Sequence, residues 1–320
     1  MSLLCVRRVG TRRRDAGRRR ACDGVVSLGH TRRRPDVEYA PGRRLVRVIL
    51  KRFVSDVFAE NCYLIAHESH RQAVVVDPGA GVSGTVAQAL EDHELELAAV
   101  LLTHGHPDHV WDAAAVAGER PVYVAEPDAY RLEDPLVHPS PLTPVLRQLL
   151  PLPFERPADV RHLPQELLVG GGAELVPGVG IRALAAPGHT EGSTIYFLAG
   201  EWDPEVIEMA TAGASASHAP TTTDADPVTD APATDAAPAT DAAPTADATP
   251  TTPAGLVLTG DVLFQGSVGR TDLPGGDPEV MEWTLRTLRQ VIDPASMLFP
   301  GHGPATTMGR ELASNPFLAR

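Results

Sequence analysis

Histidine and aspartate side chains crowd into residues 104–109, where the sequence reads His-x-His-x-Asp-His directly after an apolar run. Side chains two positions apart in an extended segment point to the same side, so His104 and His106 can bind one metal ion together. Asp108 and His109 stand where a helical pattern begins, and they point towards a neighbouring position. This loop can therefore offer ligands to two metal ions, a pattern that is rarely accidental after a buried strand.

Three further candidate ligands share this context, because each follows a predicted strand and stands beside a glycine. They are His189 in Pro-Gly-His-Thr, Asp261 in Thr-Gly-Asp-Val and His302 in Pro-Gly-His-Gly. A glycine beside a ligand lets the backbone approach an ion without a Cβ clash. Strand ends on one edge of an α/β sandwich converge, so these turns and the 104–109 loop can share one site. A single turn of this kind is usually structural, and only the combination indicates a site.

The donor set indicates the chemistry. Five imidazoles and two carboxylates suit two borderline-soft divalent ions, zinc first and iron or manganese next. Two ions about 3.5–4 Å apart lower the pKa of a shared water towards about 7 and supply hydroxide at neutral pH. We expect Asp108 and Asp261 to be the catalytic carboxylates, with metal-bound hydroxide as the nucleophile. Cys62 lies in an apolar strand and is expected in the core, and a structural zinc site would use four ligands, usually with cysteines.

The composition indicates a folded domain with unfolded parts. Of the 320 residues 43% are hydrophobic, which is enough for a sizeable core, but the chain has 30 prolines and only 5% aromatic residues. Three cysteines (Cys5, Cys22 and Cys62) are too few for a disulfide framework, which favours a reducing compartment. No apolar run approaches the roughly 18 residues of a membrane span, and no secretory segment is apparent. We therefore expect a cytoplasmic protein with no membrane or nucleic-acid partner.

Hydrophobic periodicity predicts alternating strands and helices from Val46 onward. Strands are predicted over 46–53, 61–66, 72–77, 97–102, 121–125, 193–198, 255–260 and 297–299, with a hairpin over 173–186. Helices are predicted over 83–92, 109–117, 142–150, 278–292 and 305–313. Ser83 is expected to cap the first of these helices and Asp277 the fourth, where Pro278 would be the first helical residue.

Two segments are expected to stay unfolded. Residues 1–45 are rich in arginine without apolar periodicity, which favours a solvated extension or a start codon placed too early over a nucleic-acid-binding arm or a presequence. Residues 201–253 contain no lysine or arginine and repeat Ala-Thr-Asp-Ala-Ala-Pro in tandem. We interpret them as an insertion at a hairpin tip, because loop closure costs grow slowly with length. His218 lies inside this insertion and is not expected to be a ligand.

The spacing of the candidate ligands resembles that of the metallo-β-lactamase superfamily, over residues 46–320 without the insertion. The resemblance implies an α/β fold, the four-layer αβ/βα sandwich. It also implies two metal positions with one shared ligand: His104, His106 and His189 hold the first ion, Asp108, His109 and His302 hold the second, and Asp261 bridges them. Asp77, in Val-Asp-Pro-Gly, matches a position that supports the metal loop from behind.

The glycine-rich segment 260–277 and the ending Asn-Pro-Phe-Leu at 315–318 are more narrowly similar to short bacterial glyoxalase-II-like hydrolases. This resemblance implies hydrolysis of a thioester such as S-lactoylglutathione. Larger glyoxalase II enzymes carry a C-terminal helical domain with basic residues for glutathione, whereas only residues 303–320 follow His302 here. Their lysine and tyrosine after the Gly-Asp strand are replaced by Gly-Arg-Thr-Asp. Arg270 in this segment could bind a substrate carboxylate or brace the loop against Asp272.

Two other functions are compatible with this sequence. A persulfide dioxygenase has a similar Gly-Arg-Thr-Asp loop and uses one iron in the positions of His104, His189 and Asp261, while the Leu-Pro-Gly-Gly-Asp continuation favours the hydrolase. A non-catalytic protein could use the acidic insertion to bind a partner, although the intact ligand set argues against this. A flavodiiron site would have glutamate at His106, and a β-lactamase usually lacks Asp261.

Overall fold

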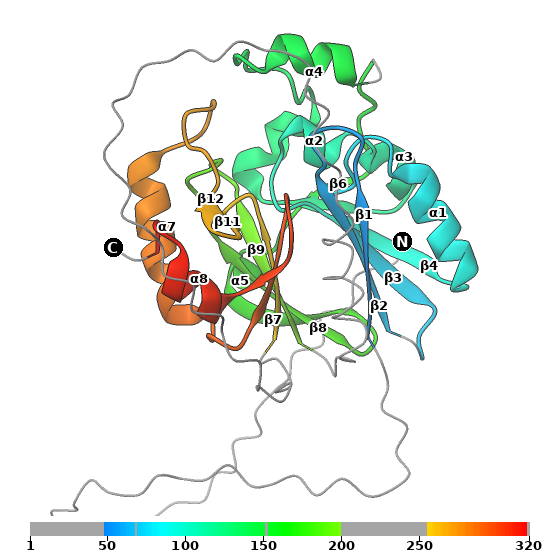
Figure 1. Ribbon diagram of the computed structural model, residues 1–320. Helices are drawn as coiled ribbons and strands as arrows, with labels where there is room; N and C mark the ends of the chain where they lie inside the picture. Colours follow the sequence, from blue (N-terminus) through cyan, green and yellow to red (C-terminus); the bar gives the residue numbers. More distant parts are fainter. Residues whose placement is uncertain (1–47, 68, 151–152, 200–254, 319–320) are drawn as a thin grey trace, which may run out of the picture.

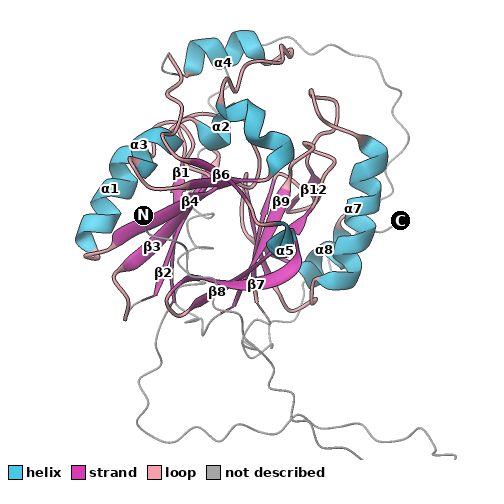
Figure 2. Cartoon of the chain, turned by 180° about the vertical axis from the view of Figure 1, so that it is seen from behind, coloured by secondary structure: helices cyan, strands magenta, loops and turns pink. Residues whose placement is uncertain are grey.

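Two six-stranded sheets face each other, and helices cover their outer sides (Figure 1). This computed structural model describes residues 48–67, 69–150, 153–199 and 255–318. Helices α1 (Ser83–Asp92) and α3 (Ala113–Ala117) lie outside the first sheet, and α7 (Pro278–Val291) and α8 (Met308–Ser314) lie outside the second (Figure 2). The predicted four-layer αβ/βα sandwich is therefore confirmed.

The first sheet has the order β1-β2-β3-β4-β5-β6. Its strands are β1 (Val48–Val54), β2 (Asn61–His67), β3 (Gln72–Val76), β4 (Glu96–Leu101), β5 (Val122–Val124) and β6 (Val160–His162). Strand β2 is antiparallel to both of its neighbours, and β3 to β6 run parallel. Parallel strands have helices on their outer face, so both faces are buried, which explains the continuous apolar runs of β3 and β4.

The second sheet has the order β14-β13-β10-β9-β8-β7. Its strands are β7 (Val169–Val176), β8 (Val179–Ala185), β9 (Thr194–Ala199), β10 (Leu256–Gly260), β13 (Met297–Pro300) and β14 (Thr306–Thr307). Strands β9 and β10 pair antiparallel, with Leu198 opposite Leu256. This confirms that the two strands flanking residues 201–253 are neighbours. The segments 1–45 and 201–253 themselves, and the predicted start at Val46, lie outside the described residues.

Each predicted strand is present, with its ends displaced by a few residues at most, and several short elements were not predicted. These are β6, the small hairpin β11 (Leu263–Phe264) and β12 (Ser267–Val268), the 3-10 helix η1 (Glu126–Leu132), β14 and α5 (Gln165–Leu168). The remaining predicted helix is α4 (Thr143–Leu149), over the end of the sandwich at the top of Figure 1. Among the described residues, no helix is long and apolar enough to cross a membrane.

The single helix predicted over 109–117 is wrong. The structure has two short helices there, α2 (Pro107–Val110) and α3, separated by a turn at Trp111 and Asp112. The backbone N–H of Asp112 donates to Pro78 O at 3.0 Å, so it does not continue the helical hydrogen-bond ladder. A contact with a different segment of the chain therefore breaks the helix, and no glycine or proline marks the break.

The predicted cap at Ser83 is also wrong. Ser83 is the first residue of α1, and no side chain of the neighbouring residues caps this helix. Instead, the carboxylate of Asp112 accepts hydrogen bonds from the N–H groups of Gly81 at 3.1 Å and Ser83 at 2.9 Å. By contrast, Asp277 caps α7 as predicted, accepting from the N–H groups of the second and third helical residues.

Candidate metal centre

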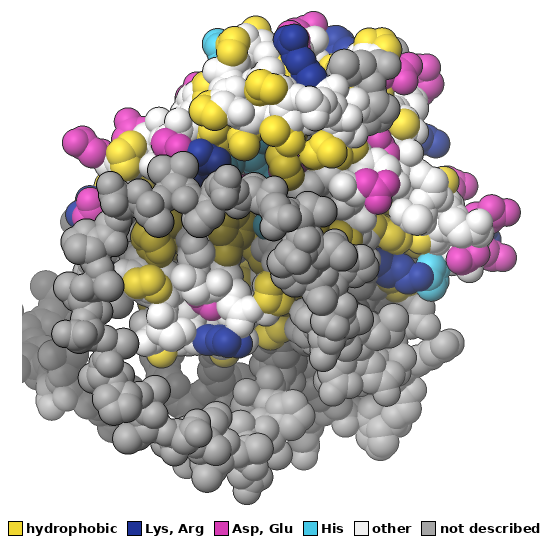
Figure 3. Space-filling model, turned by 45° about the horizontal axis from the view of Figure 1, so that its top comes forward, with side chains coloured by type: hydrophobic (Ala, Val, Ile, Leu, Met, Phe, Trp, Pro, Cys, Tyr) yellow, Lys and Arg dark blue, Asp and Glu magenta, His cyan; other side chains and the backbone are white. Residues whose placement is uncertain are grey.

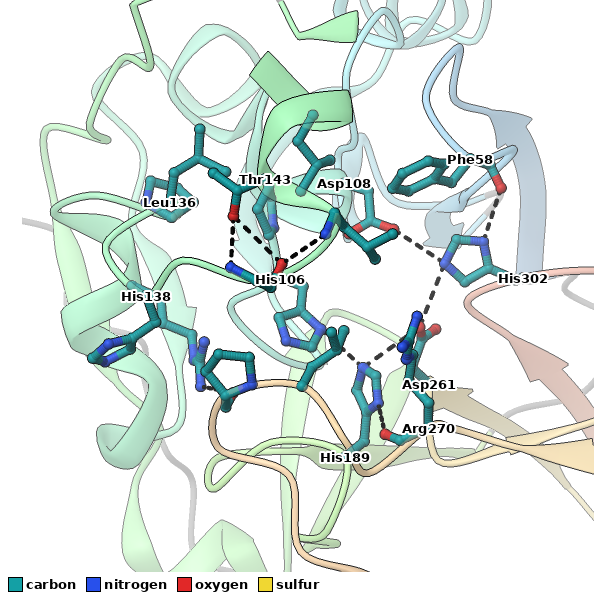
Figure 4. A pocket seen from close by; sticks show the side chains of 18 of the residues that line it. Phe58, His106, Asp108, Leu136, His138, Thr143, His189, Asp261, Arg270 and His302 are labelled. Atoms are coloured by element: carbon teal, nitrogen blue, oxygen red, sulfur yellow. Dashed lines mark hydrogen bonds and ion pairs between the residues drawn. The ribbon is translucent and has the colours of Figure 1, made fainter. Parts of the chain in front are cut away.

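The candidate ligands meet at one end of the sandwich, between the two sheets. The 104–109 loop follows β4, His189 follows β8, Asp261 follows β10 and His302 follows β13. Figure 4 shows His106, His189, Asp261 and His302 pointing into one pocket from these separate segments. The strand ends therefore converge as expected, and the predicted ligands all lie at this end of the sandwich.

A first group consists of three imidazoles whose nitrogens face one another. His106 Nδ1 lies 3.1 Å from His104 Nε2 and 2.9 Å from His189 Nε2. His104 and His189 are buried, so these nitrogens have little access to bulk water. Three imidazole nitrogens at such distances could hold one divalent ion.

A second group combines Asp108, His109 and His302. His302 Nε2 lies 3.3 Å from Asp108 Oδ2 and 3.3 Å from His109 Nε2, and His109 Nε2 lies 3.9 Å from Asp108 Oδ2. This set could hold a second ion. Asp108 and His109, which lie within α2, thus both face His302, as their position in the motif predicts. The ring of His109 also lies beside that of His104, with the two centroids 4.2 Å apart.

Asp261 stands between the two groups. Its Oδ1 lies 3.4 Å from His109 Nε2, and its Oδ2 lies 3.6 Å from His189 Nε2 and 3.4 Å from His302 Nε2. The Oδ1 atom is buried and has no hydrogen-bond partner among the described residues. A buried carboxylate oxygen without a partner is costly, and a cation is the partner that its charge calls for.

The packing around these atoms also fits metal ions. A Cβ added at Gly301 would stand 2.3 Å from Asp261 Oδ1 and 2.6 Å from His109 Cε1. Glycine therefore keeps the 300–303 turn close to the ligands without filling the space beside them. Imidazole and carboxylate donors, with no cysteine among them, are the set expected for a catalytic rather than a structural site. The residues present thus fit two divalent ions.

Carbonyl oxygens behind the site orient two of the candidate rings, those of His302 and His189. His302 Nδ1 donates to Phe58 O at 3.1 Å, and His189 Nδ1 donates to Arg270 O at 2.8 Å, which turns both Nε2 atoms towards the site. Phe58 was not predicted to take part. It and Ala59 lie in the left-handed region, with φ of 56° and 53°, so this turn holds its carbonyl towards His302 in a strained conformation.

Electrostatic surroundings differ between the two groups. Burial lowers the pKa of His104 and His106 well below the usual value of histidine, so both rings are neutral and can act as ligands. Burial also acts against a charge on His109, but the carboxylates of Asp261 and Asp108 outweigh it and raise its pKa well above the usual value. For Asp261, burial is outweighed by the attraction of His109, and its pKa is lowered.

Two tyrosine hydroxyls connect the sheets beside the ligands. Tyr196 of β9 donates to Leu102 O at 2.7 Å, two residues before His104. Tyr63 of β2 donates to Pro300 O at 2.7 Å, and Asn61 donates to the same carbonyl at 3.0 Å, two residues before His302. These bonds fix the distance between ligand-bearing turns that belong to opposite sheets.

A cavity of about 340 Å³ opens beside the ligands. Apart from the ligands, its walls are mainly apolar and include Phe58, Leu136, Leu142, Phe264 and Leu273. Figure 3 looks onto this end of the molecule and shows hydrophobic side chains around a hollow in which histidine is visible. Arg270 also lines the cavity, and it binds both carboxylate oxygens of Asp272 at 2.7 Å. Of the two roles considered for Arg270, the structure therefore shows the bracing contact.

Comparison with known proteins agrees with this geometry. Residues 55–201 match the family model of the metallo-β-lactamase superfamily. An uncharacterized protein of Mycobacterium tuberculosis is 31% identical over 274 residues, which are 85% of this chain and 98% of that protein. The chain belongs to the metallo-β-lactamase superfamily. This superfamily binds divalent metals, and the His/Asp groups are the corresponding feature of this chain.

Two further proteins are similar to this chain over most of their length. The hydroxyacylglutathione hydrolase GloC of Haemophilus influenzae is 29% identical over 265 residues, which are 82% of this chain and 93% of that protein. The crystal structure of TTHA1623 in a di-iron-bound form has a TM-score of 0.53 and 27% identity, and covers 84% of this chain and 100% of that one. These likenesses extend well beyond the residues that line the metal centre.

Two buried acidic residues of the present protein, Glu60 and Asp128, were not predicted from the sequence. Glu60 is fully buried, its carboxylate oxygens have no hydrogen-bond partner among the described residues, and Oε1 lies 3.8 Å from His109 Nδ1. Burial raises its pKa well above the usual value. Asp128 is fully buried in η1. Neither Glu60 nor Asp128 belongs to a spacing motif. The only feature of the sequence that could have indicated their burial is a charged residue close to an apolar run.

Proposed function

We propose that this protein is a metal-dependent hydrolase of the glyoxalase II type, which cleaves a thioester such as S-lactoylglutathione or a related acyl thiol. The observation that carries the proposal is the position of Asp261, whose two oxygens face the ligands of both groups. The similarity to GloC, which is named a hydroxyacylglutathione hydrolase, supports the thioester as substrate class.

In this proposal the two groups would hold two ions. His104, His106 and His189 would hold the first, Asp108, His109 and His302 would hold the second, and Asp261 would contribute to both. Two bound divalent ions would supply hydroxide at neutral pH and polarise the carbonyl under attack. The imidazole-rich donor set favours zinc, and the di-iron-bound form of TTHA1623 supports iron as the other candidate.

The chain's own residues contribute binding and orientation. Phe58, Leu136 and Phe264 give the cavity an apolar wall, which favours the hydrocarbon part of an acyl thiol and excludes water from the ligands. Asp77 and the carbonyl oxygens of Phe58 and Arg270 orient the rings, so the ligands need little reorganisation when the substrate binds. The guanidinium of Arg270 donates to the carboxylate of Asp272, so in this proposal Arg270 holds the 270–276 loop in place.

The test combines metal analysis with two assays on one preparation of purified protein. We expect about two metal ions per chain and release of thiol from S-lactoylglutathione or a simpler acyl thiol. Asp261→Ala should lose both metal and hydrolysis, whereas Asp92→Ala, which removes an exposed carboxylate at the end of α1, should retain both.

Two outcomes would contradict the proposal. One iron per chain, with oxygen uptake on glutathione persulfide and no thioester cleavage, would establish the dioxygenase instead. A protein that binds metal but turns over neither substrate class would favour a binding function without catalysis.

A further inference from the structure

Asp128 joins two of the segments that carry the first group of ligands. Its Oδ2 accepts hydrogen bonds from the backbone N–H of Gly105 and the hydroxyl of Thr190, both at 2.8 Å. Its Oδ1 accepts from the N–H of Gly192 at 2.8 Å. The carboxylate is fully buried, so water cannot replace these bonds.

The donors stand next to the ligands themselves. Gly105 separates His104 from His106, and Thr190 directly follows His189. One carboxylate thus connects the turn that carries two imidazoles of the first group with the turn that carries the third. The second group depends on other contacts, since Asp77 binds His109 and the carbonyl of Phe58 binds His302.

These turns pack closely against η1. A Cβ at Gly105 would lie 2.7 Å from Arg131 Cδ and 2.8 Å from Arg131 Cβ. A Cβ at Gly192 would lie 2.7 Å from both Cβ and Cγ of Asp128. Both glycines therefore pack directly against η1, and this helix lies between the two turns.

Arg131, one turn later in η1, places a positive charge beside Asp128, and burial still raises the pKa of that carboxyl above its usual value. Its Nε lies 3.6 Å from Asp128 Oδ1, and its guanidinium donates to Glu191 Oε2 at 2.7 Å and to Pro274 O at 3.0 Å. The charge of Asp128 is thus paired inside the protein, as a buried carboxylate requires. The same arginine also attaches the 270–276 loop to η1.

We propose that Asp128 is a positioning residue for the first metal position: it sets the separation between the His104–His106 turn and His189, and thereby the affinity of that position alone. The inference rests on the proposed function for the assignment of the metal positions. A residue needed only for folding would instead weaken both positions together and lower the stability of the metal-free protein.

The experiment measures stepwise binding of Zn²⁺ to the metal-free full chain in competition with a chromophoric chelator. His189→Ala and His302→Ala identify the two binding steps, since each removes a ligand from one group only. Asp128→Asn keeps the size of the side chain but turns an amide NH₂ towards a backbone or hydroxyl donor, so at least one hydrogen bond is lost. Asp112→Asn is the matched control, because Asp112 is also buried and also accepts two backbone N–H bonds, at α1.

We expect Asp128→Asn to weaken the step that His189→Ala abolishes by about 10- to 100-fold and to leave the other step unchanged. The control should leave both steps unchanged even where it lowers the melting temperature. Thr190→Val removes a single donor to Asp128 and should weaken the same step by about 2- to 10-fold. This second variant keeps the inference testable if Asp128→Asn does not fold.

The inference is overturned if Asp128→Asn or Thr190→Val weakens both steps equally, or weakens neither, or if Asp112→Asn has the same selective effect. Failure of the two-metal assignment, on which the inference rests, is a separate result, since it would appear in the unmodified protein as fewer than two Zn²⁺ per chain, and failure of the hydrolase activity would appear in the assays and not in Zn²⁺ binding. A chain that binds two Zn²⁺ with no selective effect of these variants would contradict the role of Asp128 only.

Discussion

Asp77 Oδ2 lies 3.1 Å from His109 Nδ1, while Oδ1 of the same carboxylate accepts the backbone N–H of Thr103 at 2.7 Å. One residue at the end of β3 therefore orients a candidate ligand and also fastens the start of the histidine loop after β4. Asp77 does this in the left-handed region, with φ of 50°, which is uncommon for a residue with a Cβ. The supporting position that the resemblance implied for Asp77 agrees with this geometry.

Replacing Asp77 by asparagine tests that support. Asparagine tolerates the left-handed conformation, so the backbone should keep its shape. The neutral amide accepts a weaker hydrogen bond from the imidazole, so we expect a loss of about 10- to 100-fold in Zn²⁺ affinity for the step that His302→Ala abolishes. Chelator competition measures this, and Asp293→Asn, at an exposed turn before β13, serves as the control. Equal Zn²⁺ affinity in the Asp77 variant and the unmodified protein would argue against the role.

Gly301→Ala tests the close approach of the 300–303 turn. The new methyl group would stand 2.3 Å from Asp261 Oδ1, so either the turn or the carboxylate must move. A displacement of about 1 Å among catalytic groups costs on the order of 100-fold in kcat/KM. Gly84→Ala is the matched control, because a Cβ at Gly84 meets nothing within 4 Å. Thioester hydrolysis and Zn²⁺ content should fall in the first variant and stay unchanged in the second.

Tyr196→Phe tests the connection between the sheets. The hydroxyl is fully buried and donates to Leu102 O, so its removal leaves a buried carbonyl without this donor. We expect the free energy of unfolding to fall by about 1–3 kcal/mol. Tyr130→Phe should change it by less than about 0.5 kcal/mol, because Tyr130 is exposed and its bond to Glu191 measures 3.5 Å. Urea denaturation of the two variants side by side measures both changes in the free energy of unfolding.

Cys62 provides a test that depends on pH. Its side chain is fully buried in β2, as predicted, and burial raises the pKa of its thiol well above the usual value. In the unfolded chain the thiol titrates near pH 8.5, so at pH 9 it is largely thiolate there and protonated in the folded protein. The folded state thus loses stability relative to the unfolded state as the pH rises above about 8.5.

Iodoacetamide should accordingly leave the Cys62 peptide unlabelled at pH 9 in the native protein and label it in urea, as read by mass spectrometry. Thioester hydrolysis should survive the native treatment. Rapid labelling of Cys62 without urea, with loss of hydrolysis, would indicate that this thiol is accessible and takes part in the reaction.

Sequence reasoning succeeded where the signal is local. The strands could be predicted from apolar runs, and Asp277 could be recognised as the cap of α7 because it directly precedes Pro278. In the structure its side chain accepts from the N–H groups two and three positions later. It failed at Ser83, because the group that caps α1 is Asp112, which lies 29 residues away from the N–H that it binds. The break between α2 and α3 was missed for the same reason, because it depends on a contact between distant segments, the hydrogen bond from Asp112 N–H to Pro78 O.

By itself, the sequence determined which donors this protein offers and that each follows a strand, since side-chain type and hydrophobic periodicity are properties of short segments. Only the tertiary structure decided what holds those donors in place. The hydrogen bonds of Asp77 to His109 and of Asp128 to Gly105 join residues 32 and 23 positions apart. Such bonds depend on which strands become neighbours and on which atoms burial leaves without water, and both are outcomes of packing the whole chain.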